Sequence, residues 1–166
     1  GSYEFTKNSD FDVFVAHLDN DLQYLIASTF LGGSGYDEAS ALAIDGAGNI
    51  CLAGTTWSVD FPVTAGSYNP VRPWALYTAF VTKLSSDLSA LVASTYLGGS
   101  AYDEATGIDI DPSDNIYVSG NTWSDDFPTT PGAFMTASQG GWDVFVSKLD
   151  NGLTTLLAST FLGGDD

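Results

Sequence analysis

The feature that most constrains the fold of this chain is an internal repeat with a step of 65 or 66 residues. Residues 28–45 read STFLGGSGYDEASALAID and residues 94–111 read STYLGGSAYDEATGIDID, with twelve of eighteen positions identical. A third copy opens with STFLGG at residues 159–164. Self-similarity at such a period is typical of architectures in which each unit buries its apolar faces against its neighbours. Residues that recur in every copy are therefore first interpreted as scaffold.

Each repeat contains four short runs rich in apolar and β-branched residues, which predict four β-strands. They are predicted at residues 42–45, 50–56, 79–84 and 91–96 in the first copy, at 108–111, 116–122, 144–149 and 156–161 in the second, and at 13–18 and 25–30 upstream of both. Alternating positions of the third strand carry the recurring residues Phe14, Phe80 and Phe145 on one face and Val15, Val81 and Val146 on the other. Both faces of the sheet are therefore predicted to be apolar and covered.

Four antiparallel strands that stack face to face on neighbouring copies indicate an all-β fold of β-propeller blades. The predicted strands number ten, or about two and a half blades, whereas closed propellers have roughly four to eight blades. We expect either a fragment of a longer propeller or one part of a ring that several chains complete. Residues 5–33 then form the second half of a blade, residues 34–99 the first repeat and residues 100–164 the second.

The second copy carries the long pattern STYLGGSxYDEAxGIxxD, then NIYVSGNTWSxDFPTTPGAF, then GGWDVFVSKLD. This pattern closely resembles the bacterial β-propeller repeat family known as SBBP, and the resemblance extends from about Asp12 to Gly164. It implies large secreted or cell-surface proteins of bacteria or archaea with many blades, and it implies no particular chemistry. The first copy departs from the pattern at residues 69–77, where NPVRPWALY replaces a Gly-rich segment.

The net charge of −17, with only four Lys or Arg residues, disfavours partners that carry phosphate or anionic lipid. No run approaches the roughly 18 apolar residues of a membrane span, so no membrane insertion is expected. The single cysteine, Cys51, aligns with Tyr117 and is interpreted as a packing residue. No hydrolase, nucleotide-binding or metalloprotease motif is present, and the only histidine, His17, has no evident catalytic partner, so the chain is not expected to be an enzyme.

Acidic residues form two groups that could hold Ca²⁺, which prefers six to eight oxygen ligands. The first group lies between the LGG motif and the predicted first strand of each copy and contains Asp37, Glu38, Asp103 and Glu104. The second group lies in the first hairpin of the second copy and contains Asp109, Asp111 and Asp114. The alternative for the first group is that a carboxylate caps backbone amides and locks adjacent blades. The alternative for the second is an ordinary hairpin turn initiated by Asp111, whose side chain can hydrogen-bond the backbone two residues on.

The long connection after the second strand carries an aromatic and acidic pattern in both copies. Its members are Trp57, Asp60 and Phe61 in the first copy, and Trp123, Asp126 and Phe127 in the second. An aromatic platform beside a carboxylate can hold a sugar ring, although the same rings could fill space under a long loop.

Arg72, the only arginine, and Trp74 lie where the copies diverge, and they are candidates for a binding loop or an ordinary variable loop. The leading hypothesis is a non-enzymatic secreted or cell-surface propeller module for recognition, adhesion or scaffolding. The alternatives are a lectin-like carbohydrate-binding propeller and a fragment of a polysaccharide-active enzyme. Expected partners are further copies of the chain and an extracellular glycan or protein.

Overall fold

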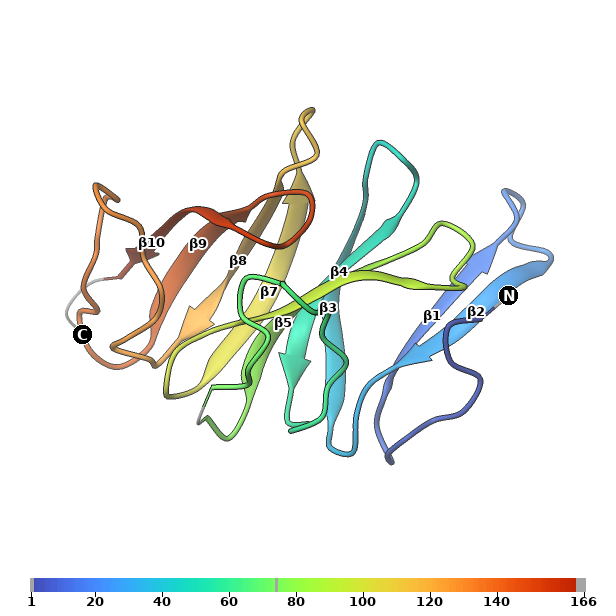
Figure 1. The fold of residues 1–166 in the computed structure, drawn as a ribbon, viewed down its shortest axis with the longest axis horizontal. Coiled ribbons are helices and arrows are strands. Elements are labelled where there is room, and N and C mark those ends of the chain that lie inside the picture. Colours follow the sequence, from blue (N-terminus) through green and yellow to red (C-terminus); the bar gives the residue numbers. More distant parts are fainter. Residues whose placement is uncertain (1, 74, 164–166) are drawn as a thin grey trace.

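The computed structural model describes residues 2–73 and 75–163, and in this part of the chain all regular structure is β-strand. Three antiparallel sheets lie side by side along the longest axis of the molecule (Figure 1). The described residues include no helix that is long and apolar enough to cross a membrane.

The first sheet, called here the half-blade, contains only two strands, β1 (Val13–Leu18) and β2 (Leu25–Leu31). Blade 1 contains four strands in sequence order, β3 (Asp37–Ile44), β4 (Ile50–Thr56), β5 (Thr78–Leu84) and β6 (Leu91–Leu97). Blade 2 repeats this arrangement with β7 (Asp103–Ile110), β8 (Ile116–Thr122), β9 (Asp143–Leu149) and β10 (Leu156–Leu162). The ten strands predicted from the sequence are therefore confirmed.

Two strands begin earlier in the structure than the sequence predicted. β3 begins at Asp37 and β7 at Asp103, five residues before the predicted starts. The pairing register shifts between Ala39 and Ala41, and again between Ala105 and Gly107. This irregularity interrupts the alternation of side chains from which a strand is predicted, because one extra residue moves the following side chains to the other face.

The long connections from β4 to β5 and from β8 to β9 run back along the outer strand of their own blade. In blade 1 the Thr64 N–H donates to the Ser94 carbonyl of β6 at 3.0 Å, and in blade 2 the Thr130 N–H donates to the Ser159 carbonyl of β10 at 3.0 Å. The connections thus occupy hydrogen-bonding groups at the outer edges of the sheets, which would otherwise be open to pairing with other chains.

The core is divided between two interfaces, one on each side of blade 1. One cluster joins the half-blade to blade 1 and includes Val15, Leu31, Phe80 and Leu84. The other joins blade 1 to blade 2 and includes residues of both, among them Val81 and Phe145. The prediction that both faces are covered holds for β5, which is buried along its whole length.

The two outer sheets are covered on one face only. In β1 the Val15 side chain is buried and Phe14 is 58% exposed, so the face that carries Phe14 lacks a neighbour among the described residues. The half-blade also covers only part of blade 1, because Leu42 and Ile44 of β3 are exposed while their counterparts Ile108 and Ile110 of β7 pack against a core cluster.

Candidate functional site

Seven aromatic side chains form a continuous row across all three sheets. Each ring contacts the next, with centroid distances of 4.8 to 6.2 Å, in the order Phe11, Tyr36, Trp57, Tyr77, Tyr102, Trp123 and Trp142. The row follows one edge of the stack, where β1, β3, β5, β7 and β9 begin and β4 and β8 end; this is the lower edge in Figure 1. We call these seven residues the aromatic row.

The rings of the aromatic row remain accessible although they touch one another. Trp57 is 46% exposed and Trp123 is 49% exposed, whereas the aromatic residues of the core are buried. At the centre of the row Tyr77 stacks on both of its neighbours, at 5.5 Å and 11° from Trp57 and at 4.8 Å and 17° from Tyr102. These stacked contacts join blade 1 to blade 2 and hold the exposed rings in fixed positions.

A local sequence pattern places each ring. Four of the seven are followed by Asp, and in three of these, Tyr36, Tyr102 and Trp142, the Asp is the first residue of a strand. Phe11-Asp12 precedes β1 directly, and Tyr77 stands directly before Thr78, the first residue of β5. Trp57 and Trp123 follow the last residues of β4 and β8 directly. Since β3 and β4 are antiparallel, the start of one strand and the end of the other meet at the same edge of the sheet.

The Asp residue that follows the ring fixes the loops around it. One oxygen of Asp37 accepts a hydrogen bond from the Thr56 hydroxyl at 2.5 Å, and the other accepts from the Ser58 hydroxyl at 2.7 Å and the Gly33 N–H at 2.8 Å. A Cβ atom on Gly33 would lie 2.7 Å from the Ser58 Cβ and 3.0 Å from the Phe61 backbone N, so a larger residue would displace this turn. The buried carboxylate thus holds the LGG turn against the turn that carries Trp57.

Blade 2 repeats the arrangement with Asp103, which accepts from the Thr122 hydroxyl at 2.5 Å, the Gly99 N–H at 2.9 Å and the Ser124 hydroxyl at 3.1 Å. Burial raises the pKa of Asp103 to about 6, because removal from water disfavours the charged form more than the three hydrogen bonds favour it. Burial likewise raises the pKa of Asp37.

A cavity of about 420 Å³ opens beside the middle of the aromatic row, between blade 1 and blade 2. Its walls include the rings of Tyr36, Trp57 and Tyr77 and the carboxylates of Glu38 and Glu104. The Tyr36 hydroxyl donates to Glu38 at 3.0 Å, and burial together with a hydrogen bond to Glu104 raises the pKa of Tyr77 to about 12. The described lining therefore offers apolar rings, hydroxyl groups and two negative charges, which is the composition of a ligand site with a few oriented polar groups.

Of the six residues predicted as ligand platforms in the long connections, only the tryptophans lie in the aromatic row. Phe61 and Phe127 are each 3% exposed and pack on the core rings Phe80 and Phe145, which is the space-filling role that the sequence offered as the alternative. Asp60 accepts hydrogen bonds from the N–H and hydroxyl of Ser34 at 2.8 and 2.9 Å. Asp126 makes the same pair of contacts with Ser100 at 2.7 and 3.0 Å.

Arg72 lies apart from the aromatic row. Its guanidinium donates to the Leu76 carbonyl at 2.7 Å, and it lines a separate cavity of about 500 Å³ with Asp126. Trp74, the second residue predicted for this loop, lies outside the described residues.

Of the predicted calcium ligands, Glu38 and Glu104 line one cavity, and the others do not line it. The first group was predicted to lie between the LGG motif and the first strand of each repeat. Its four residues instead open the strands themselves, because β3 begins at Asp37 and β7 at Asp103. In the hairpin group, Asp111 forms an ion pair with Lys148 and accepts hydrogen bonds from the Asn115 side chain and from backbone N–H groups of the turn. Asp114 accepts a hydrogen bond from the Gly46 N–H of blade 1 at 2.8 Å. The Asp109 carboxylate accepts one from the N–H of the next residue, Ile110. In the part of the chain that the structure describes, no group of three or more His, Cys, Asp or Glu side chains is placed to hold a metal ion.

Stacked sheets of antiparallel strands in sequence order define this chain as part of a β-propeller. The family model described as SBBP, a β-propeller repeat, matches residues 28–62 and 94–128. The chain therefore contains two segments that match the SBBP β-propeller repeat. Each segment begins in the last strand of one sheet, β2 or β6, and ends in the long connection of the next blade. No curated protein matches the chain.

Proposed function

We propose that this chain is a non-enzymatic recognition module of a secreted or cell-surface protein, and that its ligand lies along the aromatic row. The observation that carries this proposal is the row itself. Exposed aromatic side chains are enriched at binding surfaces, where they bury much area with little loss of conformational freedom. Here they are also held in place by one another and by the buried carboxylates of Asp37 and Asp103. A surface that is already ordered loses little entropy on binding.

The open stack also fits a role in adhesion or scaffolding. Successive repeats extend the row by adding rings at the same edge, so a longer array of blades would present a longer surface. A ligand that contacts several blades at once would gain avidity without new kinds of contact.

The second candidate is a lectin-like function, and the cavity beside Trp57 favours it. Aromatic faces can stack on the apolar face of a sugar ring, while the Glu38 and Glu104 carboxylates can accept hydrogen bonds from its hydroxyl groups. The row is continuous over seven rings, which suits a linear oligosaccharide better than a single sugar.

The experiment is a binding screen of the fluorescently labelled chain against arrays of linear oligosaccharides and extracellular proteins. Trp57→Ala is the test variant. Val59→Asp is the matched control, because Val59 lies two residues away on the same connection and the second copy carries Asp125 at this position. The proposal predicts that Trp57→Ala loses the ligands that the unchanged chain and Val59→Asp both bind.

Equal binding by all three chains would contradict the placement of the ligand on the aromatic row. Binding of proteins alone would exclude the lectin-like candidate and retain the recognition module. Since Glu38 and Glu104 line one cavity, oligosaccharides that bind are also assayed for new reducing ends. Release of such ends that stops in Glu38→Gln or Glu104→Gln would contradict the non-enzymatic proposal.

A further inference from the structure

The sheets of this molecule stack with a fixed polarity. We call the two faces of each sheet the Phe face, after Phe14, Phe80 and Phe145, and the Val face, after Val15, Val81 and Val146. The Val face of the half-blade packs on the Phe face of blade 1. The Val face of blade 1 packs on the Phe face of blade 2. Both interfaces inside the chain are therefore built from the same two unlike surfaces.

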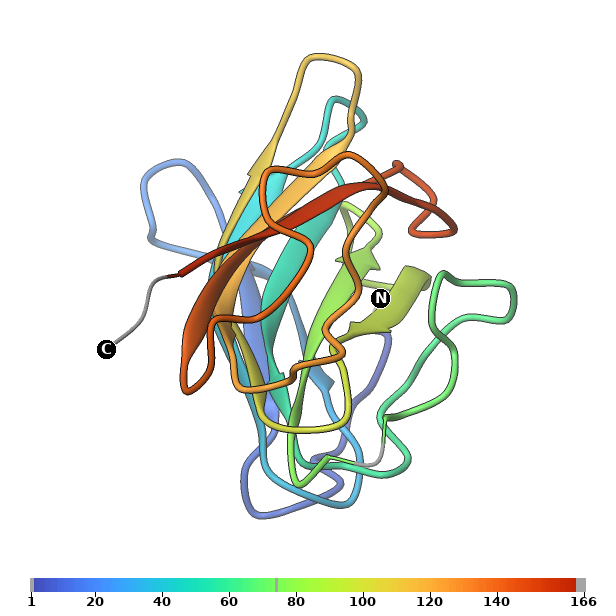
Figure 2. The same cartoon turned by 90° about the vertical axis from the view of Figure 1, so that its left-hand side faces the viewer.

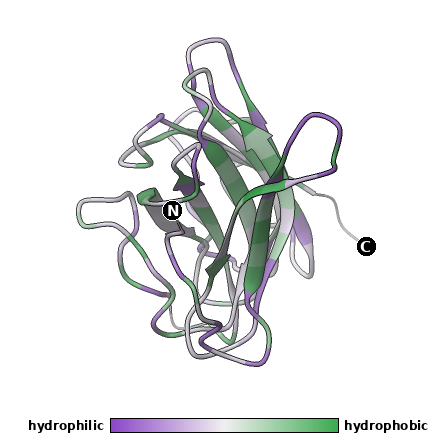
Figure 3. Cartoon of the chain, turned by 90° about the vertical axis from the view of Figure 1, so that its right-hand side faces the viewer, coloured by the Kyte–Doolittle hydropathy of each residue, from purple (hydrophilic) through white to green (hydrophobic). Residues whose placement is uncertain are grey.

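The two ends of the stack expose one of each surface. At the blade 2 end, seen toward the viewer in Figure 2, the free surface is a Val face. Its members Tyr117, Val144 and Leu162 are 37 to 44% exposed, while their blade 1 counterparts Cys51, Ala79 and Leu97 are fully buried by blade 2. At the other end, seen toward the viewer in Figure 3, the half-blade exposes a Phe face with Phe14 and Leu18. The free ends are thus the two halves of the interface that occurs twice inside the chain.

Each sheet carries one leucine with an unusual backbone conformation in the hairpin between its last two strands. Leu22, Leu88 and Leu153 occupy equivalent hairpin positions and all have positive φ, at 55°, 57° and 54°. This backbone region is unfavourable for leucine, so its repeated use needs a compensating contact. Leu88 and Leu153 have that contact, since both are completely buried, whereas Leu22 is 74% exposed.

The partner of each buried leucine is also equivalent. The Tyr3 N–H donates to the Leu88 carbonyl at 2.6 Å, and the Tyr68 N–H donates to the Leu153 carbonyl at 2.7 Å. The residue of blade 2 at the position of Tyr3 and Tyr68 is Phe134, which is 82% exposed. By this equivalence, Leu22 carries the acceptor carbonyl of such a hydrogen bond at one end of the molecule, and Phe134 carries the donor N–H at the other end.

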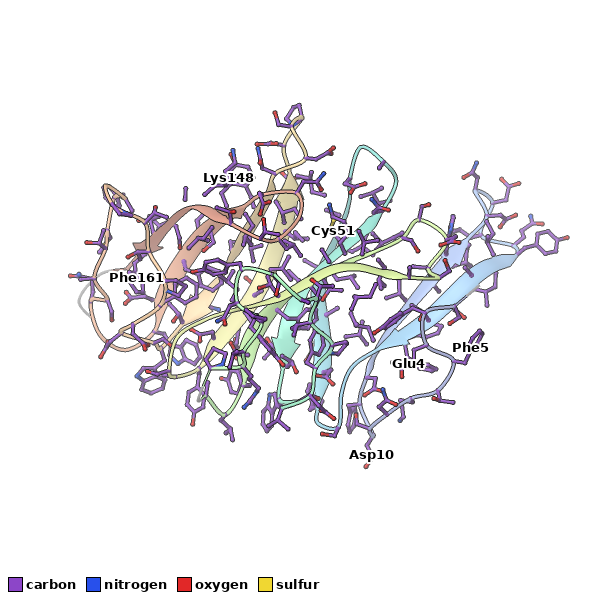
Figure 4. The ribbon with its side chains drawn as sticks, viewed as in Figure 1. Glu4, Phe5, Asp10, Cys51, Lys148 and Phe161 are labelled. Atoms are coloured by element: carbon purple, nitrogen blue, oxygen red, sulfur yellow. The ribbon has the colours of Figure 1, made fainter. Side chains whose placement is uncertain are left out.

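The polar groups at the two ends match in the same way. Lys83 of blade 1 crosses to blade 2 and donates to the Asn151 carbonyl at 2.8 Å and to its side-chain oxygen. Its blade 2 counterpart, Lys148, labelled in Figure 4, lines an open cavity with Tyr117 and Phe134. Asn20 of the half-blade stands at the position of Asn151, within the shared sequence Leu-Asp-Asn.

We propose that a second copy of this chain binds head to tail, with the Val face of blade 2 in one copy on the Phe face of the half-blade in the other. Leu22 of one copy then packs under Phe134 of its neighbour, and Lys148 reaches Asn20. Each copy supplies three sheets, so two copies with two identical interfaces close a ring of six sheets, of which four are full blades and two are half-blades. That number falls within the roughly four to eight blades of closed propellers.

The test is the mass in solution, measured by light scattering after size exclusion over a range of concentrations. The proposal predicts a concentration-dependent shift from the mass of one chain, 17.4 kDa, to the mass of two chains. Because each of the two interfaces loses one buried leucine contact, Leu22→Asn should weaken the association roughly a hundredfold to ten-thousandfold. Asparagine tolerates positive φ, so this variant should keep or raise the melting temperature. Val59→Asp, on the aromatic edge, is the control and should associate like the unchanged chain.

The polarity is tested by mixing two variants that are each defective at one end, Leu22→Asn and Phe134→Asp. A head-to-tail pair formed from one copy of each retains one intact interface. The mixture should therefore contain dimer at concentrations where either variant alone is monomeric. Any of four results would overturn the proposal. Two concern the unchanged chain, which would remain a single chain at all concentrations or form assemblies larger than two chains. Two concern the variants: Leu22→Asn would dimerise as well as the unchanged chain, or the mixture would contain no dimer.

Discussion

Lys83 and Lys148 occupy equivalent positions in blade 1 and blade 2, so replacing each by methionine tests whether one blade buries the next. Lys83 forms an ion pair with Asp45 at 3.0 Å, and the two side chains are 3% and 2% exposed. Lys148 forms the same pair with Asp111 at 3.0 Å, but these side chains are 25% and 21% exposed. The ion pair is the same in both places, but Lys83 is covered by the neighbouring blade, whereas Lys148 is partly exposed and lies 4.8 Å from the centroid of the Tyr117 ring.

The expected loss of stability is much larger for Lys83→Met. Removing one partner of a buried ion pair leaves an uncompensated charge and costs about 3–5 kcal/mol. Lys83→Met also removes the two hydrogen bonds to Asn151 of blade 2. Partly exposed pairs contribute only about 0–1 kcal/mol, so Lys148→Met should unfold at nearly the unchanged urea concentration.

Urea denaturation, followed by fluorescence at a low protein concentration where the chain is monomeric, compares the two variants. The double variant Lys83→Met with Asp45→Asn should recover part of the loss, because no buried charge remains unpaired. Equal and small losses for Lys83→Met and Lys148→Met would refute the burial of blade 1 by blade 2.

Three further predictions follow from individual side chains. Asp103 binds its proton more tightly in the folded chain (pKa about 6) than in the unfolded chain (about 3.9), so its own contribution to stability should fall by roughly 3 kcal/mol as the pH rises from about 4 to 6. The difference in urea midpoint between the unchanged chain and Asp103→Asn should therefore change over this pH range, and a constant difference would contradict the assignment. A Cβ atom on Gly120 would lie 1.9 Å from the Glu104 carbonyl oxygen, so Gly120→Ala should lose at least about 2 kcal/mol in thermal or urea unfolding. Gly107→Ala should lose much less, because the Cβ atom there would meet only the Ser119 hydroxyl oxygen, at 2.7 Å, which can rotate away. The Cys51 thiol is fully buried in the middle of the stack (Figure 4), and burial raises its pKa to about 11, so a thiol reagent should label it only as the chain unfolds; rapid labelling of the folded chain would argue against the stacked blades.

The sequence predicted the strands well because their alternation is strong and repeats in each copy. β4 and β8 begin and end where they were expected. The starts of β3 and β7 were missed because the register shift near Ala39 and Ala105 hides the alternation, and because Asp and Glu are unusual at the start of a strand.

The prediction that both faces of every sheet are covered was too general. It holds for β5, which has a neighbouring sheet on each side. It fails for the outer sheets, where Phe14 and Val144 are exposed, because the same residue types recur whether or not a neighbour is present. A repeated pattern shows which surface can be buried, and the position of a repeat in the stack decides whether it is.

The candidate site was found only in part. Trp57 and Trp123 were identified because they stand in a recognisable loop pattern, but Phe61 and Phe127 of the same pattern face the core. The other rings of the aromatic row come from separate loops, and only the stacking of the sheets brings them together. The available signal was the recurrence of an aromatic residue followed by Asp where strands begin, as in Tyr36-Asp37.

The most direct test of the central claim, that the aromatic row is the ligand surface, is a nuclear magnetic resonance titration of the tryptophan indole N–H signals. Assignment by single Trp→Phe variants distinguishes Trp57, Trp123 and Trp142 of the row. The probes are the oligosaccharides or proteins selected by the array screen. We predict that a bound ligand shifts the signal of Trp57 together with at least one of the other two. A ligand that binds and leaves all three signals unchanged would contradict the account.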